Sequence, residues 1–409
     1  MCPEQRRPFT HTMVIGLLAA FLLSSLAIGP SLSKEEEILK KYKLFSDVVG
    51  KIENHYVNEV DEEKLFYSAL DGMVRSLDQH SQFLAPELYE ELRISTTGEF
   101  GGLGIQISIR DGILTIISPI EGTPADEAGL RPGDRIIEIE GQTTKDVTLE
   151  EAVKRLRGPK GAEVTIRIWR ALKGGTSETR LVTIVRDIIH VKSVKWQMMS
   201  EGIAYLRLNE FQGDSGDELR RALKSAKAEG AKGMILDLRR NPGGLLSAAI
   251  DVAELFVPKG ELIVYTLGRD EDQSRRYVAQ ARKREWDGPL VVLIDAGSAS
   301  ASEIVAGAVR DLEVGILVGT HSFGKASVQN VYELPDNSAL KLTTAYYYTS
   351  SGTQIDGKGI APHRVVEPEY LEEEDPGREE NEMLRDPQVA AAMDVLKGQL
   401  LLHESGLVG

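Results

Sequence analysis

Short apolar runs alternate with amphipathic segments in the second half of the chain. Four runs are predicted to be buried strands: 203–208, 233–238, 290–294 and 315–318. Three intervening segments are predicted to be helices: 215–229, 248–256 and 300–312. This succession predicts an α/β core with a largely parallel sheet. Because ligand chemistry in such sheets lies beyond the carboxyl ends of the strands, we expect the site in the loops after Leu238, Ile294 and Val318.

The first half of the chain has two other patterns. Residues 34–92 are charged and place apolar side chains at three- and four-residue steps, which predicts a helical region. From Gly98 onward glycine and β-branched residues dominate. Apolar and polar residues alternate over 164–168, which predicts strands, and one helix is predicted at 148–157.

The chain is acidic. It has 409 residues with 48 Lys+Arg and 63 Asp+Glu, a net charge of −15, which excludes a nucleic-acid-binding surface built on overall basicity. Acidic residues gather beyond Glu367, where we predict a solvated linker. A helix over 387–402 follows, and its apolar stripe can pack on the body or on a second subunit. The single cysteine, Cys2, permits no intrachain disulfide and no cysteine-based zinc site.

The amino terminus has the pattern of a targeting segment. Arg6 and Arg7 precede an uncharged apolar stretch over 13–28, as in a secretory signal peptide. The stretch is short for a membrane span, and no clean A-x-A cleavage site follows it, so a cleaved signal and an uncleaved anchor both stay open. In either case we expect an extracytoplasmic body, periplasmic or anchored to the outer face of the cytoplasmic membrane through this segment alone.

The segment Gly297-Ser-Ala-Ser-Ala-Ser-Glu-Ile lies between a predicted strand and a predicted helix. At such a turn a serine hydroxyl projects into open space while N–H groups of the first helical turn point toward it, which suits a nucleophile with an oxyanion site. The same residues suit a helix cap, because Ser300 and Glu303 have the spacing of a capping box. The segment alone leaves both interpretations open.

Two further loops carry candidate chemistry. In Asn241-Pro-Gly-Gly the adjacent glycines let the backbone approach a substrate and expose N–H donors, although such dipeptides are also common in plain turns. The other loop holds Lys325, whose amine can act as a general base if burial removes its charge. Gln329, four residues later, could fix that amine by a hydrogen bond. The alternative for Lys325 is an ordinary surface lysine.

Other chemistries have weaker support. Gly319-x4-Gly324-Lys325 nearly matches a phosphate loop, but Ala326 stands where Ser or Thr must bind Mg²⁺, and the residues that follow alternate like a strand. A serine–histidine pair with His321 is a further alternative. No H-E-x-x-H motif and no closely spaced histidine pair exists, so metalloprotease chemistry is unsupported.

The glycine-rich segment Gly98-Glu-Phe-Gly-Gly-Leu-Gly-Ile precedes a predicted strand. Successive glycines can form a nest of N–H groups that captures a carboxylate, while the strand pairs with an extended peptide. The helix at 148–157 presents an apolar stripe that can wall such a pocket. The segment gives little support to a dinucleotide-binding fingerprint, because no helix follows the glycines.

Six ordered motifs together resemble the carboxyl-terminal processing peptidases, or tail-specific proteases, which are Ser-Lys serine peptidases with a PDZ domain. They are Leu77-Asp-Gln-His-Ser-Gln-Phe-Leu, the glycine-rich opening with Leu130-Arg-Pro-Gly-Asp-Arg-Ile, Asn241-Pro-Gly-Gly, Ser298-Ala-Ser-Ala-Ser-Glu, Phe323-Gly-Lys and Asp356-Gly-Lys-Gly-Ile-Ala-Pro. The resemblance covers nearly everything after residue 40. It implies an extracytoplasmic serine endopeptidase that recognises protein C-termini through its PDZ domain and cleaves through an acyl-enzyme, without a cofactor or a metal.

The resemblance also implies roles for individual residues. Ser300 is the nucleophile, Lys325 is the general base, and Gln329 supports the base. The N–H groups of Ala301 and of the Gly243-Gly244 turn form the oxyanion hole. Four residues of the PDZ domain are expected to contact the peptide: Gly102, Leu103, Gly104 and Ile105. Arg157 is a candidate for coupling peptide binding to the active site, and the alternative is a solvated cation at a helix end. His80, in the first motif, has no assigned role.

The expected architecture is a multidomain α/β protein in five parts. These are a signal peptide or membrane anchor at 1–33, an N-terminal helical region at 34–96, a PDZ domain at 97–187, a Ser-Lys protease core with a largely parallel sheet at 188–368, and an acidic linker with a C-terminal helix at 369–409. By resemblance we expect protein substrates with exposed C-termini, an adaptor lipoprotein and a homo-oligomer. The alternative function is a catalytically inactive PDZ scaffold that binds peptides.

Overall fold

The computed structural model describes residues 29–172, 174–369, 383 and 385–404. The uncharged stretch over 13–28 and most of the predicted acidic linker lie outside these residues. The chain divides into two compact units, residues 1–73 and 74–409. Across the described part of the chain, no helix is long and apolar enough to cross a membrane.

The first unit contains the predicted helical region at 34–96 only as far as residue 73. This part forms α2 (Gly29–His55) and α3 (Glu62–Arg75), and the last two residues of α3 belong to the second unit. The remainder of the predicted region lies in the second unit and includes a short strand at 82–84. The rings of Phe45 and Phe66 pack with their centroids 6.1 Å apart, which joins the two helices.

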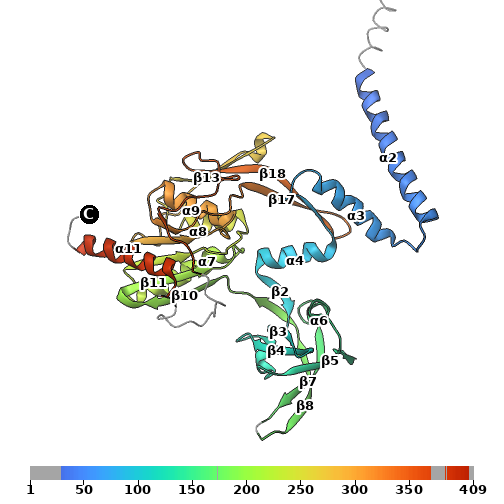
Figure 1. Ribbon diagram of the computed structural model, residues 1–409, viewed down its shortest axis with the longest axis horizontal. Coiled ribbons are helices and arrows are strands. Elements are labelled where there is room, and N and C mark those ends of the chain that lie inside the picture. The colour runs from blue at the N-terminus through green and yellow to red at the C-terminus, as the bar shows by residue number, and fades with distance from the viewer. Residues whose placement is uncertain (1–28, 173, 370–382, 384, 405–409) are drawn as a thin grey trace, which may run out of the picture. The chain divides into compact units, whose positions relative to one another are not determined.

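The second unit is built around a six-stranded sheet (Figure 1). In spatial order its strands are β10 (Val194–Met199), β11 (Ile203–Leu208), β12 (Gly233–Asp237), β15 (Leu290–Ile294), β16 (Ile316–Gly319) and β19 (Arg364–Val365). The neighbours from β11 to β19 pair in parallel, and only β10 runs antiparallel. The predicted largely parallel sheet is therefore confirmed.

Helices cover both faces of this sheet. One face packs against α7 (Ser215–Ala228), α8 (Leu246–Ala253) and α9 (Ala301–Asp311), and the other against α11 (Pro387–Glu404). Successive strand residues point to opposite faces: Leu206 belongs to the first apolar core and Tyr205 to the second. Burial on both faces explains why the strands are continuous apolar runs. The terminal helix packs on the body of its own chain.

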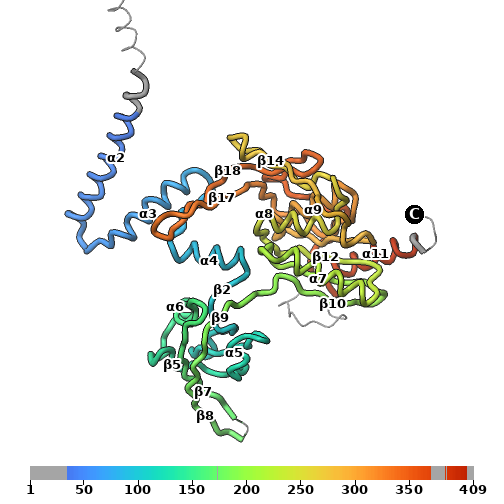
Figure 2. Tube along the Cα trace, turned by 180° about the vertical axis from the view of Figure 1, so that it is seen from behind, coloured from blue at the N-terminus to red at the C-terminus, as the bar shows by residue number. Residues whose placement is uncertain are grey.

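A second, antiparallel sheet stands beside the first and was not predicted. Its strands are β1 (Gln82–Leu84), β13 (Leu262–Gly268), β14 (Arg275–Val278), β17 (Ser327–Glu333) and β18 (Ala339–Thr349). Figure 2 shows β17 and β18 running side by side, as their pairing requires. The short β1 pairs with the start of β18 and leads into α4 (Pro86–Thr97).

A smaller β-rich domain is inserted after α4. It begins and ends with the paired strands β2 (Glu99–Gly102) and β9 (Asp187–His190). Its remaining strands are β3 (Ile105–Arg110), β4 (Ile113–Pro119), β5 (Arg135–Ile139), β6 (Gln142–Thr143), β7 (Glu163–Ala171) and β8 (Ser177–Val185). Its helices are α5 (Pro124–Glu127) and α6 (Leu149–Leu156), and the hydroxyl of Thr148 caps α6 by accepting a hydrogen bond from the N–H of Glu151. Short 3₁₀ helices elsewhere in the chain are η1 (Ser200–Gly202) and η2 (Glu271–Gln273).

Candidate active site

The loops that follow β12, β15 and β16 meet at one pocket, which we call the Ser300 pocket. This is where the topology of a parallel sheet places functional loops. The cavity has a volume of about 450 Å³, and α4, β17 and β18 complete its wall. It is lined by all six residues that the sequence predicts for catalysis: Ser300, Lys325, Gln329, Gly243, Gly244 and Ala301.

Ser300 stands at the turn between β15 and α9 in an unusual backbone conformation. Its φ and ψ are 55° and −112°, a region that residues with a Cβ seldom occupy. The residue is half-buried and directly precedes Ala301, the first residue of α9, which also lines the pocket. This is the arrangement expected of an exposed nucleophile on a sharp strand-to-helix turn.

Glu303 joins the serine turn to the lysine loop. Its carboxylate is completely buried and accepts four hydrogen bonds. Oε2 accepts from the N–H of Ser300 and of Lys325, both at 2.9 Å. Oε1 accepts from the N–H of Gly324 at 2.7 Å and the hydroxyl of Ser322 at 2.6 Å. Burial raises the pKa of Glu303, and these hydrogen bonds oppose the rise. The predicted contact of Glu303 with the cap position is present, and the same side chain also holds the lysine loop.

Gly243 lies directly against the serine turn. A Cβ at Gly243 would be 2.7 Å from the Cβ of Ser300 and 3.0 Å from the backbone nitrogen of Ala301, so no larger residue fits without movement. The N–H of Gly243 donates to the side-chain oxygen of Asn241 at 2.9 Å. In the described part of the chain, the N–H groups of Gly244 and Ala301 have no hydrogen-bond acceptor. Those two donors are therefore available to a ligand in the pocket.

The side chain of Lys325 is half-buried in the same pocket. Burial lowers the pKa of Lys325, the positive charge of Lys341 lowers it further, and Glu303 opposes both effects. The hydroxyl of Tyr347 donates to the backbone carbonyl of Lys325, which fixes the start of β17. Burial raises the pKa of Tyr347 well above its ordinary value, so this hydroxyl keeps its proton.

Gln329 lines the pocket but has other partners. Its side-chain nitrogen donates to the hydroxyl of Ser327 at 2.7 Å and to that of Thr343 at 3.4 Å. These contacts hold the amide against β18, on the strand that begins just after Lys325.

Two residues near Lys325 were not predicted for the site. Lys341 lines the pocket from β18. Burial lowers the pKa of His80, and the positive charge of Lys325 lowers it further, which places His80 within electrostatic range of the amine. No local sequence signal marks Lys341, because its place in the pocket depends on the pairing of β17 with β18.

The rival interpretations of the lysine loop do not match the structure. His321 is exposed and does not line the Ser300 pocket. The segment after Lys325 forms strand β17, whereas a phosphate loop leads into a helix.

The predicted peptide-binding residues join β2 to β3 in the small domain. Leu103 is buried in its core, and Gly104 has a φ of 77° with no room for a Cβ, which would lie 2.3 Å from that of Thr123. Arg157 caps the end of α6, and its guanidinium carbon lies 4.8 Å from the centre of the Phe100 ring on β2. This cation–π contact joins the end of the helix to the strand that enters the domain.

A buried ionic network supports the loop of Gly243 from behind. Asp237, at the end of β12, is completely buried and accepts hydrogen bonds from Tyr205 and Arg239. Arg239 also donates to Asp386 at 2.6 Å and to Gln388 at 2.9 Å, next to and within α11. Burial opposes ionisation, but the Arg239 guanidinium holds the pKa of Asp237 below its ordinary value. The C-terminal helix is thus tied to the segment that leads into Asn241.

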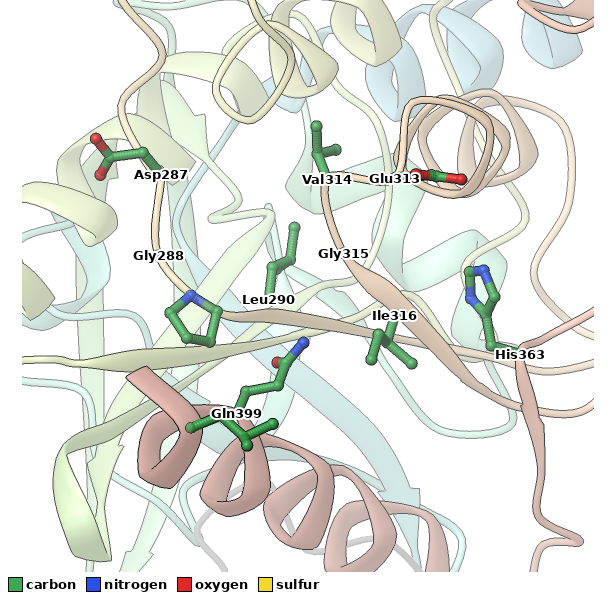
Figure 3. A pocket seen from close by; sticks show the side chains of 11 residues that line it. Asp287, Gly288, Leu290, Glu313, Val314, Gly315, Ile316, His363 and Gln399 are labelled. Carbon is green, nitrogen blue, oxygen red and sulfur yellow. The ribbon is translucent and has the colours of Figure 1, made fainter. Parts of the chain in front are cut away.

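Another cavity, of about 480 Å³, lies at the opposite ends of β15 and β16 (Figure 3). His363 and Gln399 line it, and Gln399 comes from α11. It contains none of the residues predicted for catalysis or peptide binding.

Comparison with known proteins gives matches over most of the chain. The profile of peptidase family S41 matches residues 202–366, and that of a PDZ domain matches residues 115–170. A carboxy-terminal-processing protease of Bartonella bacilliformis is 42% identical over 358 residues, which cover 87% of this chain and 81% of that protein. A carboxyl-terminal-processing protease of Synechocystis sp. is 39% identical over 350 residues, 84% of this chain and 79% of that protein. Among solved structures, the photosystem II D1 C-terminal processing protease is 27% identical with a TM-score of 0.45, covering 79% of this chain and 92% of that one.

Proposed function

Since this chain belongs to the carboxy-terminal-processing serine proteases of peptidase family S41 and contains a PDZ domain, we propose that it hydrolyses peptide bonds with Ser300 as nucleophile and Lys325 as general base. The observation that carries the proposal is the single pocket that both side chains line. Their backbone N–H groups share one carboxylate oxygen of Glu303, so the two loops are held together.

The proton of Ser300 passes to the uncharged amine of Lys325 as Oγ attacks the scissile carbonyl carbon. A lysine with the ordinary pKa of about 10.4 is almost fully protonated at neutral pH and cannot accept this proton. The lowered pKa of the half-buried Lys325 supports the assignment. The ammonium then protonates the leaving amine, and an ester of Ser300 remains. Water, deprotonated by the same amine, hydrolyses that ester and restores the serine.

The oxyanion of each tetrahedral intermediate is assigned to the N–H groups of Ala301 and Gly244. Two observations support this assignment. Both residues line the pocket, and neither N–H group has a hydrogen-bond acceptor in the described residues. Gly243 has a different part in this arrangement: because it has no side chain, its loop can lie directly against Ser300. The N-terminal end of α9 adds its partial positive charge at the same place.

Substrate proteins are proposed to be recognised at their free C-termini by the PDZ domain, in the region of Gly102–Ile105. This proposal is supported by the position of these residues in a loop that leads into β3, in the same domain as α6. An extended peptide can pair there with the edge of β3. The proposal includes an extracytoplasmic location, from the pattern over 13–28. By resemblance it also includes a homo-oligomer and delivery of substrates by an adaptor lipoprotein.

The test uses a purified folded reporter protein that ends in an apolar free C-terminus. We expect wild-type enzyme to cleave it, and Ser300→Ala and Lys325→Ala each to abolish cleavage while still binding the reporter. Lys259→Ala, which changes an exposed lysine, is the matched control and should retain full activity. Binding without cleavage by the wild type would support the inactive-scaffold alternative. Wild-type turnover by Lys325→Ala would refute the lysine base.

A further inference from the structure

The Ser300 pocket contains a second lysine. Lys341 lies on β18, opposite Val331 of β17, and Thr343 lies opposite Gln329 two residues farther along the same strand. Alternate residues of a strand share a face, and Lys341, Gln329 and Val331 all line the pocket. The side chain of Lys341 is therefore placed on the catalytic side of the sheet by the strand pairing itself.

Neither amine of this lysine pair has a fixed partner. Over the part of the chain that the structure describes, no ion pair or hydrogen bond is formed by the side-chain nitrogen of Lys325 or of Lys341. Burial lowers the pKa of Lys341 as it does that of Lys325. Two ammonium groups that share a partly dehydrated cavity repel each other, so the protonated state of one disfavours the protonated state of the other.

The carboxylate that opposes the lowered pKa of Lys325 does not cancel this effect. Glu303 favours the charged form of Lys325, but both of its oxygens already accept hydrogen bonds from other donors. The remaining titratable or charged groups that line the pocket or act on this region are Tyr89 and Arg93 of α4, Glu210 after β11, Tyr347 of β18, His80 and Asp78 before β1, and Asp356 after β18. Of the groups that shift Lys325 itself, only Lys341 carries a like charge.

We propose that Lys341 is a positioning residue of the active site, whose positive charge keeps the neighbouring amine of Lys325 uncharged and so able to accept the proton of Ser300. The proposal rests on the proposed role of Lys325 as general base. It assigns Lys341 no contact with the reacting atoms. Its effect is confined to the proton equilibrium of Lys325.

This role predicts a specific change in the pH dependence of kcat/KM, whose acidic limb reports the base of the free enzyme. In Lys341→Met the repulsion is absent, so the limb should move to higher pH by about one unit. At pH values on the acidic limb, kcat/KM of this variant should be about tenfold lower than that of wild type. At higher pH, its plateau should stay near the wild-type value. Lys341→Arg keeps the charge and should keep the wild-type limb, because arginine stays protonated.

The experiment measures kcat/KM against pH for wild type, Lys341→Met, Lys341→Gln and Lys341→Arg, with Lys259→Met as the control for loss of a surface charge. Thermal unfolding of each variant shows that it is folded, and the glutamine variant replaces the methionine variant if the latter unfolds. An unchanged limb in the neutral variants would overturn the proposal. So would a raised KM at every pH with no shift of the limb, which would indicate a substrate contact instead. Activity of Lys325→Ala equal to wild type would refute the proposed function itself, so the two failures are distinguishable.

Discussion

The backbone N–H groups of Ser300 and Lys325 donate to the same oxygen, Oε2 of Glu303, each at 2.9 Å. Their nitrogen atoms can therefore be no farther apart than the sum of those two distances, although the residues follow different strands of the sheet. A buried N–H must find an acceptor, so this shared oxygen couples the position of the serine turn to that of the lysine loop. The side chain of Glu303 therefore fixes the position of the two loops relative to each other.

Removal of that carboxylate should damage stability and activity together. Glu303→Ala leaves four donors without their acceptor, and we expect a loss of about 3 kcal/mol in the free energy of unfolding. Misplacement of the loops should lower kcat by about 100-fold. Urea unfolding and peptide cleavage measure the two effects. Glu313→Ala, at an exposed residue after α9, is the control. An unfolding free energy equal to wild type would contradict the coupling.

A methyl group at position 243 should slow catalysis strongly, because it meets the serine turn. In Gly243→Ala the new Cβ meets Ser300 and Ala301, and we expect kcat to fall by about 100-fold. The control is Gly260→Ala, since Gly260 has a similar φ, 92° against 106°, but open space around it. Both variants bear the backbone strain, and only the first should lose turnover in a cleavage assay. Equal activity of the two variants would show that contact with Ser300 is unimportant.

The buried guanidinium of Arg239 should be essential for stability at neutral pH. Arg239→Met leaves the fully buried Asp237 without the guanidinium that donates hydrogen bonds to it, which costs about 3–5 kcal/mol. Asp386→Asn removes only an outer partner and should cost about 1 kcal/mol. Denaturant unfolding at pH 7 compares the stabilities of the two variants. Similar small losses in both would contradict a central role for the pair of Arg239 and Asp237.

The same pair sets the response of stability to acid. Because the folded pKa of Asp237 is held below the unfolded value of about 3.9, its ionisation stabilises the fold above that value. The stabilisation is lost as pH falls through the folded pKa. In Arg239→Met this loss should disappear, since the ionised carboxylate is no longer favoured in the fold. Unfolding curves measured below pH 4 show whether the free energy of unfolding falls with pH in wild type and stays constant in Arg239→Met.

Replacement of the proposed base should make the protein more stable while it removes activity. The folded pKa of Lys325 lies below its unfolded value, so between the two the unfolded chain binds more protons and stability rises with pH. At pH 7 the buried amine is thus a cost, and Lys325→Met should raise the unfolding free energy by about 1 kcal/mol. The same substitution at the exposed Lys259 should have no such effect. A destabilised Lys325→Met would contradict the dehydration of the amine.

Much of the core was predictable because its signals are local. The strand over 203–208 and the strand over 290–294 have the predicted bounds, since continuous apolar runs mark strands buried on both faces. The strand-to-helix turn at Ser300 was predicted from its small residues and the cap spacing. The parallel topology then brings the three candidate loops to one edge.

The antiparallel sheet and the second lysine were not predictable in this way. Strand β1 pairs with β18, which lies more than half the chain away, and three residues carry no periodic signal. Nothing in the sequence distinguishes Lys341 from the other lysines. The pairing of β17 with β18 places it in the pocket. The link from Arg239 to Asp386 likewise depends on how α11 folds back on the sheet. Such contacts are set by tertiary packing, which local sequence does not encode.

The central claim is that Lys325 activates the hydroxyl of Ser300, and covalent labelling tests it most directly. The enzyme is treated with a fluorophosphonate, which reacts with activated serines, and the modified residue is identified by mass spectrometry of its peptides. Ser298→Ala and Ser302→Ala report on the neighbouring serines, and Lys325→Ala reports on the base. We predict one adduct, on Ser300, that forms faster as pH rises and at least about 100-fold more slowly in Lys325→Ala. An adduct on another serine, or equal labelling rates in wild type and Lys325→Ala, would contradict the account.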